Sequence, residues 1–129
     1  MSDVVLDASA LLAALAQEPR AERWSVKVSG ATMSAVNLSE VIAKLADVGW
    51  PEQEIKAMIE PLSLSIVPFD AASAYDSGLL RPLTKRAGLS FGDRACLALA
   101  VRTNLPVLTA DRAWAKIDVG AQIMIMGEG

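Results

Sequence analysis

Four acidic residues stand beside predicted strands and helices at positions where their carboxylates could meet around a cation. Asp7 and Asp111 each end an apolar run, Asp93 opens an apolar helical segment, and Glu40 lies one helical turn after Asn37. Carboxylates that converge repel one another unless a proton or a cation lies between them. Oxygen ligands select hard cations such as Mg²⁺ or Mn²⁺, which activate water and polarise phosphoryl oxygens. The set therefore predicts a divalent-metal site for phosphodiester hydrolysis.

Each acid also has a structural interpretation when it is taken alone. Asp7 and Asp111 could cap the helices that follow them. Asp93 could interact with the dipole of its own helix, and Glu40 could lie on a solvated helical face. Only the four acids together favour the metal site.

The composition narrows the possible chemistry. The 129 residues include no His, which excludes Ser-His-Asp triads, Cys-His pairs, His-ligated zinc and His acid–base catalysis. The one cysteine, Cys96, lies in an apolar run, so we expect a core residue without a disulfide in a reducing compartment. Any chemistry must therefore use carboxylates, hydroxyls, Lys, Arg or a metal.

Charge and hydropathy predict a soluble protein of the cytoplasm. The net charge of −3 lacks the basic signature of many nucleic-acid-binding proteins, although a local basic patch can still bind RNA. The first residues do not resemble a signal peptide, and no apolar run is long enough to span a membrane. About 53% of the residues are hydrophobic, which suits one domain over residues 1–129.

The elements that must position the acids alternate between strands and helices. Apolar runs predict strands over 3–6, 31–34, 62–69, 105–109 and 122–126. Helical spacing predicts helices over 8–17, 20–28, 36–48, 52–59, 71–86 and 91–103 and a helical turn over 112–116, with Pro82 kinking or splitting its segment. This alternation predicts a three-layer α/β/α fold around a short central parallel sheet. Because crossovers return to the same edge of such a sheet, the four acids can converge there.

Four segments of the sequence resemble the motifs of PIN-domain ribonucleases, most closely the VapC toxins of bacterial toxin–antitoxin pairs. They follow in the family's order over nearly the whole chain. The segments are Val5-Leu6-Asp7-Ala8-Ser9-Ala10, Asn37-Leu38-Ser39-Glu40-Val41, Leu89-Ser90-Phe91-Gly92-Asp93-Arg94-Ala95-Cys96-Leu97-Ala98-Leu99-Ala100 and Leu108-Thr109-Ala110-Asp111-Arg112-Ala113-Trp114.

The resemblance implies an endoribonuclease that depends on Mg²⁺ or Mn²⁺. It assigns the catalytic and metal-binding roles to Asp7, Glu40, Asp93 and Asp111. It implies supporting hydrogen bonds from Ser9 and Thr109, and a further acid at Asp118, which could equally be a turn residue. It also implies a homodimer and a cognate antitoxin of the VapB type.

Two further groups of polar residues could serve this site. Asn37 could orient Glu40 or a metal-bound water, or it could cap its own helix. Basic side chains that could contact RNA phosphates, pair with the acids or simply be solvated are Arg81, Lys85, Arg86, Arg94 and Arg112.

The apolar residues near the amino terminus are numerous for so small a sheet. They are Leu11, Leu12, Leu15, Trp24 and, further along the chain, Trp50. They could form the core, or part of a groove for an antitoxin peptide or a second copy of the chain. We expect Trp114 to pack in the core.

Two other classes of protein would also place acids on such a fold. A receiver-type phosphoacceptor domain expects paired acids near the first strand and a Lys after the last, and this chain matches neither expectation. A non-catalytic PIN-like module that binds RNA or protein would keep the fold without the chemistry.

Overall fold

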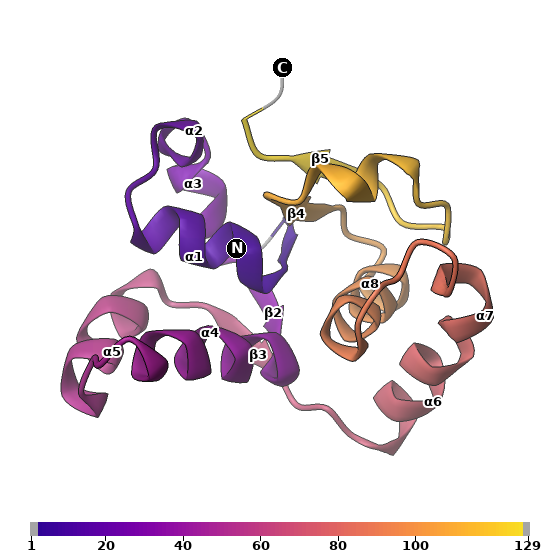
Figure 1. Cartoon of the computed structure of the whole chain (residues 1–129), viewed down its shortest axis with the longest axis horizontal. Helices are drawn as coiled ribbons and strands as arrows, with labels where there is room; N and C mark the ends of the chain where they lie inside the picture. Colours follow the sequence, from indigo (N-terminus) through magenta and orange to yellow (C-terminus); the bar gives the residue numbers. More distant parts are fainter. Residues whose placement is uncertain (1–2, 128–129) are drawn as a thin grey trace.

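A parallel β-sheet forms the centre of the molecule in the computed structural model, which describes residues 3–127 (Figure 1). The strands lie in the order β3-β2-β1-β4-β5, and every neighbouring pair is parallel. Their bounds are β1 Val5–Leu6, β2 Thr32–Ser34, β3 Ser65–Val67, β4 Val107–Thr109 and β5 Ile123–Ile125. The predicted parallel α/β fold is confirmed, with strands shorter than the apolar runs.

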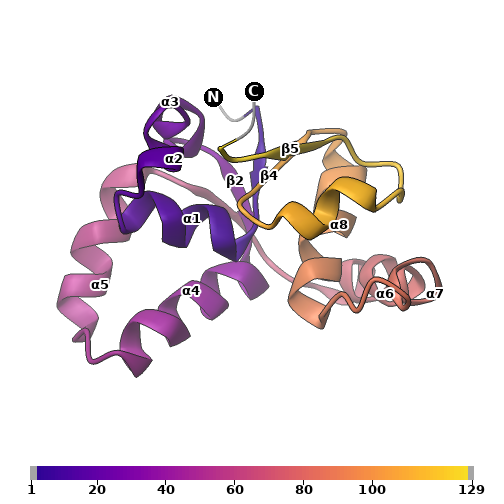
Figure 2. The ribbon, with the colours of Figure 1, turned by 45° about the horizontal axis from the view of Figure 1, so that its top comes forward.

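Helices cover both faces of the sheet, as Figures 1 and 2 show from two directions. The α-helices are α1 Ala8–Leu15, α2 Pro19–Glu22, α3 Ser25–Val28, α4 Ala35–Asp47, α5 Glu52–Ile59, α6 Ala71–Leu79, α7 Arg81–Thr84 and α8 Phe91–Thr103. Two 3₁₀ helices are η1 Glu60–Leu62 and η2 Arg112–Lys116. None of the helices within residues 3–127 is long and apolar enough to cross a membrane.

The alternation of side chains along the strands divides the core in two. Val4 and Leu6 pack with residues of α1, α4 and α5, whereas Val5 packs on the other face with residues of α8. The same division separates Leu108 from Val107 on β4. Both central strands are thus buried on both faces, which explains why their sequences are continuous apolar runs.

The structure divides two of the predicted helices and shows where the side chain of Trp114 lies. The predicted helix 20–28 is two short helices, because Trp24 leaves the helical conformation between them, at φ −100° and ψ 0°, and packs against the core. The predicted helix 71–86 divides at Leu80, ahead of Pro82, as its proline indicated. Trp114 is fully buried, so its predicted packing role is confirmed.

The best-defined helix, α8, begins and ends where its sequence indicates. Ser90 and Asp93 form a reciprocal capping box at its start, and Asn104 ends it with a left-handed φ of 56°. These local signals agree with the apolar face that α8 packs against the sheet, so its bounds match the predicted 91–103.

The strand order identifies the edge of the sheet where a ligand would bind. The chain runs outward from β1 to β3 and then returns to β4 on the other side of β1. In open α/β sheets such a reversal creates a crevice at the carboxyl ends of the two strands. The order also differs from the 2-1-3-4-5 arrangement of receiver-type domains, which removes that alternative.

Candidate active site

Asp7 lies at the centre of a hydrogen-bonded cluster in this crevice. It directly follows β1 and caps α1, accepting a hydrogen bond of 2.8 Å from the backbone N–H of Ala10. The Ser9 hydroxyl donates to its two carboxylate oxygens at 2.8 and 2.9 Å, and the Thr109 hydroxyl donates to Oδ2 at 2.5 Å. Its capping role and its place in the site therefore coexist.

The environment of Asp7 disfavours its negative charge. Only 4% of the residue is exposed, and this burial raises the pKa of the carboxyl from 3.8 to about 6. The hydrogen bonds from Thr109, Ala10 and Ser9 lower the pKa and offset part of that effect, while the charge of Asp93 raises it further. A cation beside Asp7 would favour the ionised form, which is the form that ligates a metal.

Two hydroxyl groups connect the ends of β1 and β4 across the crevice. Besides donating to Asp7, Ser9 accepts a hydrogen bond from the backbone N–H of Ala110 at 3.0 Å, and Thr109 accepts one from Asp111 N–H at 3.0 Å. These bonds fix the backbone that leads into Asp111. The exposed carboxylate of Asp111 caps η2 by accepting from Ala113 N–H at 3.0 Å.

Glu40 reaches the crevice from α4 with the help of a buried neighbour. The Asn37 side-chain amide donates to Glu40 Oε1 and to the backbone carbonyl of Gly92, each at 2.9 Å. Ser34, not Asn37, caps α4, through Val36 N–H at 3.2 Å. Asn37 therefore connects Glu40 with the first turn of α8 rather than capping the start of its own helix.

Asp93 completes the acidic group from the first turn of α8. Its Oδ2 accepts from Ser90 N–H at 3.0 Å, and the carboxyl group is partly buried. Burial raises the pKa of the Cys96 thiol well above its usual range, and the charges of Asp7, Asp93 and Glu40 add to that rise. Asp7, Asp93 and Glu40 thus all lie near enough to the buried Cys96 for their charges to act on its thiol.

The acids are not arranged as a closed metal cage. Within residues 3–127, no three His, Cys, Asp or Glu side chains lie close enough together to hold one ion. Mg²⁺ typically keeps several waters and binds directly to one or two carboxylates, so acids around a crevice can act partly through water. The donors are all oxygen, and the buried Asn37 Oδ1 has no hydrogen-bond partner. This chemistry fits a hard cation.

The remaining predicted site residues are exposed or have other partners. Arg94 donates to the Ser77 carbonyl at 3.2 Å and lies over the Phe91 ring at 6.0 Å. Asp118 is exposed in the segment after η2. The other basic residues are all exposed: Arg81, Lys85, Arg86 and Arg112.

Two residues at the site were not predicted from the sequence. Gly92 lies against the Glu40 carboxylate, and Arg20 donates from Nη1 to the Ala110 carbonyl at 3.3 Å, beside Asp111. The only signal for Gly92 was its place immediately before Asp93 in a motif. Arg20 had none, because the contact joins residues 90 positions apart.

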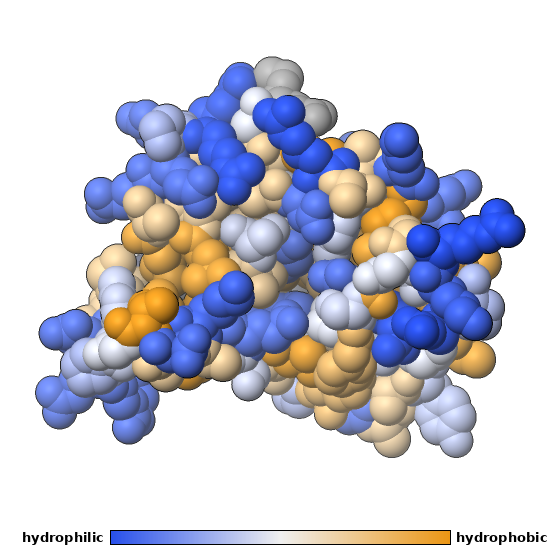
Figure 3. Space-filling model, in the orientation of Figure 1, coloured by the Kyte–Doolittle hydropathy of each residue, from blue (hydrophilic) through white to orange (hydrophobic). Residues whose placement is uncertain are grey.

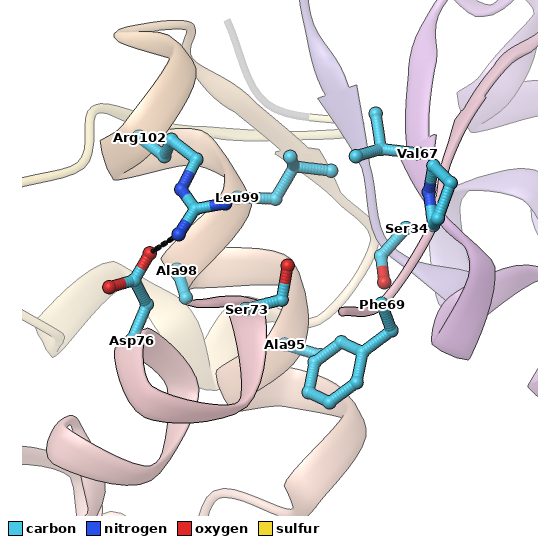
Figure 4. A pocket seen from close by; sticks show the side chains of 10 residues that line it. Ser34, Val67, Phe69, Ser73, Asp76, Ala95, Ala98, Leu99 and Arg102 are labelled. Carbon is cyan, nitrogen blue, oxygen red and sulfur yellow. Dashed lines mark hydrogen bonds and ion pairs between the residues drawn. The ribbon is translucent and has the colours of Figure 1, made fainter. Parts of the chain in front are cut away.

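A separate small pocket lies between the end of the sheet and helices α6 and α8 (Figure 4). The Asp76–Arg102 ion pair lies at its side, and Phe69 and Leu99 help to line it. Its volume of about 10 Å³ is close to that of a single water site, and it contains none of the four predicted acids. We therefore place no ligand there.

Comparisons with solved structures give the same fold. VapBC bound to DNA from Salmonella typhimurium superposes with a TM-score of 0.75 and 22% identity over 98% of this chain and 99% of that one. FitAcB from Neisseria gonorrhoeae has a TM-score of 0.67 and 21% identity over 94% and 96%. VapC20 from Mycobacterium tuberculosis, a sarcin-ricin loop cleaving toxin, has 0.70 and 17% over 92% and 98%.

The sequence itself carries the family signature. No curated protein matches it at a significant level, but the model of the PIN domain matches residues 4–120. Because that match covers most of the 129 residues, the protein belongs to the PIN domain family.

Proposed function

We propose that this protein is an endoribonuclease dependent on Mg²⁺ or Mn²⁺ and the toxin of a VapBC-type pair. The observation that supports the proposal is the buried Asp7 at the end of β1, whose carboxylate accepts hydrogen bonds from the Ser9 and Thr109 hydroxyls at the β1–β4 crevice. Nucleases of this chemistry need clustered carboxylates and no His, which agrees with the composition. The likeness to VapC20, a toxin that cleaves RNA, supports the same reaction.

The proposed catalytic group is Asp7, Glu40, Asp93 and Asp111. A bound divalent ion supplies an activated water and stabilises negative charge on the phosphate. Ser9 and Thr109 hold the Asp7 carboxylate in one orientation through their hydroxyl groups. Asp111 joins the group through the backbone that these hydroxyls fix, and Asp118 remains a candidate for a further acid.

The proposed RNA contacts are the exposed basic side chains around the crevice, namely Arg81, Lys85, Arg86 and Arg112. Arg94 is a weaker candidate, because its guanidinium already bonds to Ser77 and stacks on Phe91. Phosphate contacts of this kind add affinity without reading sequence, so they do not select one RNA.

The proposed protein partners are a VapB-like antitoxin and a second copy of the chain. The predicted apolar groove is largely core: Leu11 is fully buried, and Leu12, Leu15, Trp24 and Trp50 are partly buried against the core. Figure 3 shows an apolar area at its left, over α1 and helices α4 and α5. We propose this area for the antitoxin, since related VapBC proteins crystallise as complexes.

Cleavage of total cellular RNA by the purified chain tests the proposed reaction. With Mg²⁺ or Mn²⁺ we expect discrete fragments, which EDTA abolishes and which the Asp93→Ala variant reduces by at least about 100-fold, since a carboxylate of the metal site is lost. A parallel measurement of melting temperature with and without Mn²⁺ checks that the ion binds.

A matched control variant separates loss of a site acid from loss of surface charge. Asp47→Ala removes an exposed acid at the far end of α4, and its activity should equal that of the wild type. If the folded wild type binds Mn²⁺ but cleaves no RNA, the alternative of a non-catalytic PIN-like module replaces the enzyme. The observation that favours this alternative is that the carboxylates of Asp93 and Asp111 cap helices, which is a structural role.

A further inference from the structure

The Glu40 carboxylate occupies the space that a side chain at position 92 would fill. A Cβ built on Gly92 would lie 2.3 Å from Glu40 Oε2 and 2.5 Å from its Cδ and Oε1. A Cβ does not come within 3.0 Å of a non-bonded heavy atom without displacement, so any residue with a Cβ would push the carboxylate aside. The observed position of the Glu40 carboxylate therefore requires a residue without a Cβ at position 92.

A second residue holds the carboxylate from the other side. Asn37 is 1% exposed, and its side-chain nitrogen donates to both Glu40 Oε1 and the Gly92 carbonyl. The reverse orientation of the amide would turn Oδ1 toward two acceptors, so only one orientation is favourable. Asn37 thus connects the Glu40 carboxylate to the backbone against which it lies.

We propose that Asn37 and Gly92 are positioning residues that together form a seat for the Glu40 carboxylate, fixing it against the first turn of α8 before a metal ion binds. The inference rests on the proposed function, because the position of the Glu40 carboxylate matters for binding only if Glu40 belongs to the metal site. A glutamate side chain has several rotatable bonds, and ordering it in advance lowers the entropy lost on binding. The first turn of α8 also places partial positive charge near the carboxylate.

Replacement of Gly92 by alanine separates this role from folding. The backbone of Gly92 does not have a positive φ, so alanine can adopt its conformation. Alanine also favours a helix more than glycine does. The clash would fall on the far end of a flexible side chain, which can rotate away. Gly92→Ala should therefore fold normally while it displaces Glu40.

The measurement is the affinity of the full chain for Mn²⁺ by calorimetry, beside the melting temperature in EDTA. We expect Gly92→Ala to weaken Mn²⁺ binding by about tenfold or more, with a melting temperature equal to or above that of the wild type. Asn37→Leu, which keeps the side-chain volume but loses both donors, should weaken binding in the same direction. A purely structural role would lower the melting temperature and leave the affinity of the folded fraction unchanged.

Gly78→Ala is the matched control. Gly78 lies within α6, and a Cβ there would meet no atom within 4 Å. This variant should stabilise α6 while Mn²⁺ affinity stays at the wild-type value. It separates the general effect of alanine in a helix from the effect of displacing Glu40.

The outcomes distinguish the seat from the metal site itself. If the wild type binds Mn²⁺, Glu40→Gln weakens that binding, and Gly92→Ala and Asn37→Leu bind as the wild type does, the seat is refuted and the metal site stands. If the folded wild type does not bind Mn²⁺, both the proposed metal-dependent function and the proposed seat are refuted. Weakened binding in Gly92→Ala without loss of stability supports the seat.

Discussion

At the scale of single residues, Asp7 shows how a functional position can oppose stability. Its carboxyl is buried, and the pKa of about 6 means that the ionised form is disfavoured in the folded chain. Three hydrogen-bond donors reduce that cost without removing it. The protein therefore keeps a destabilising charge where a cation could offset it.

Replacing Asp7 with asparagine should stabilise the metal-free protein at neutral pH. Asparagine can keep the cap on α1 and carries no charge. The folded pKa of Asp7 lies above its ordinary value of 3.8, so wild-type stability is lost as pH rises from about 4 through about 6. The shift of about 2 pKa units corresponds to at most roughly 3 kcal/mol in the free energy of unfolding.

Urea denaturation in EDTA at pH 4 and pH 8 measures this difference. We expect Asp7→Asn to exceed the wild type in free energy of unfolding at pH 8 and to approach it at pH 4, where the folded-state carboxyl is protonated and the unfolded-state carboxyl is only partly ionised. The same variant should lose Mn²⁺-dependent stabilisation. Equal wild-type and variant stability at pH 8 would contradict a raised pKa for Asp7.

At the scale of elements, the first turn of α8 combines a helix cap with the candidate site. Ser90 and Asp93 exchange hydrogen bonds of 3.0 and 3.2 Å between side chains and backbone N–H groups. The same turn carries Asp93 and places Gly92 against the Glu40 carboxylate. The sequence of this turn therefore serves both the start of the helix and the direction of a carboxylate.

Removing the cap should lower both the stability of the protein and its RNA cleavage. Ser90→Ala loses the acceptor for Asp93 N–H, which we expect to lower the free energy of unfolding by about 1 kcal/mol. The Asp93 side chain then sits on a turn that opens more readily, so RNA cleavage should also fall. Ser90→Thr keeps a hydroxyl acceptor and should restore most of the stability; chemical denaturation of the three proteins measures the order.

At the scale of the whole molecule, one outer face carries exposed apolar side chains. Tyr75 and Leu79 on α6 are 74% and 72% exposed, Leu83 on α7 is 66% exposed, and Val101 on α8 is also exposed. Tyr75 lines a surface hollow with Leu79, and Leu79 lines another with Val101, so Tyr75, Leu79 and Val101 form one α6–α8 patch. We propose this patch, rather than the partly buried residues of α1, as the homodimer interface.

A charge in the centre of the α6–α8 patch should prevent dimerisation. We expect light scattering to give a dimer for the wild type and a monomer for Leu79→Glu at micromolar concentration, because a buried unpaired carboxylate opposes association. Val26→Glu places the same charge at a residue of α3 that is 85% exposed and should remain dimeric. A monomeric wild type would refute the proposed homodimer.

Much of this architecture could be predicted because its signals are local. The apolar runs predict the strands, and helical spacing predicts α8, whose ends are capped locally by Ser90 and Asn104. Hydrogen bonds between near neighbours along the chain produce caps and turns, so a single sequence contains them. The positions of the acids likewise follow from the predicted ends of strands and helices. Asp7 and Asp111 each follow a strand, so both lie at one edge of the sheet.

Other features depended on contacts between distant parts of the chain. The division between α2 and α3 follows the packing of Trp24, and the raised pKa of Asp7 follows its burial and its closeness to Asp93. The exposed α6–α8 patch was not predicted, because the helical spacing of apolar residues does not reveal whether a neighbour covers them.

The amino-acid sequence by itself determined which groups are available for chemistry and roughly where each lies along a strand or helix. The tertiary structure alone decided their surroundings: Glu40 rests against Gly92, and Asn37 joins the two across 55 residues of chain. The physical reason is the separation along the chain over which each interaction acts. Propensities and caps act within a few residues, whereas burial, charge–charge repulsion and steric fit depend on which segments the fold brings together.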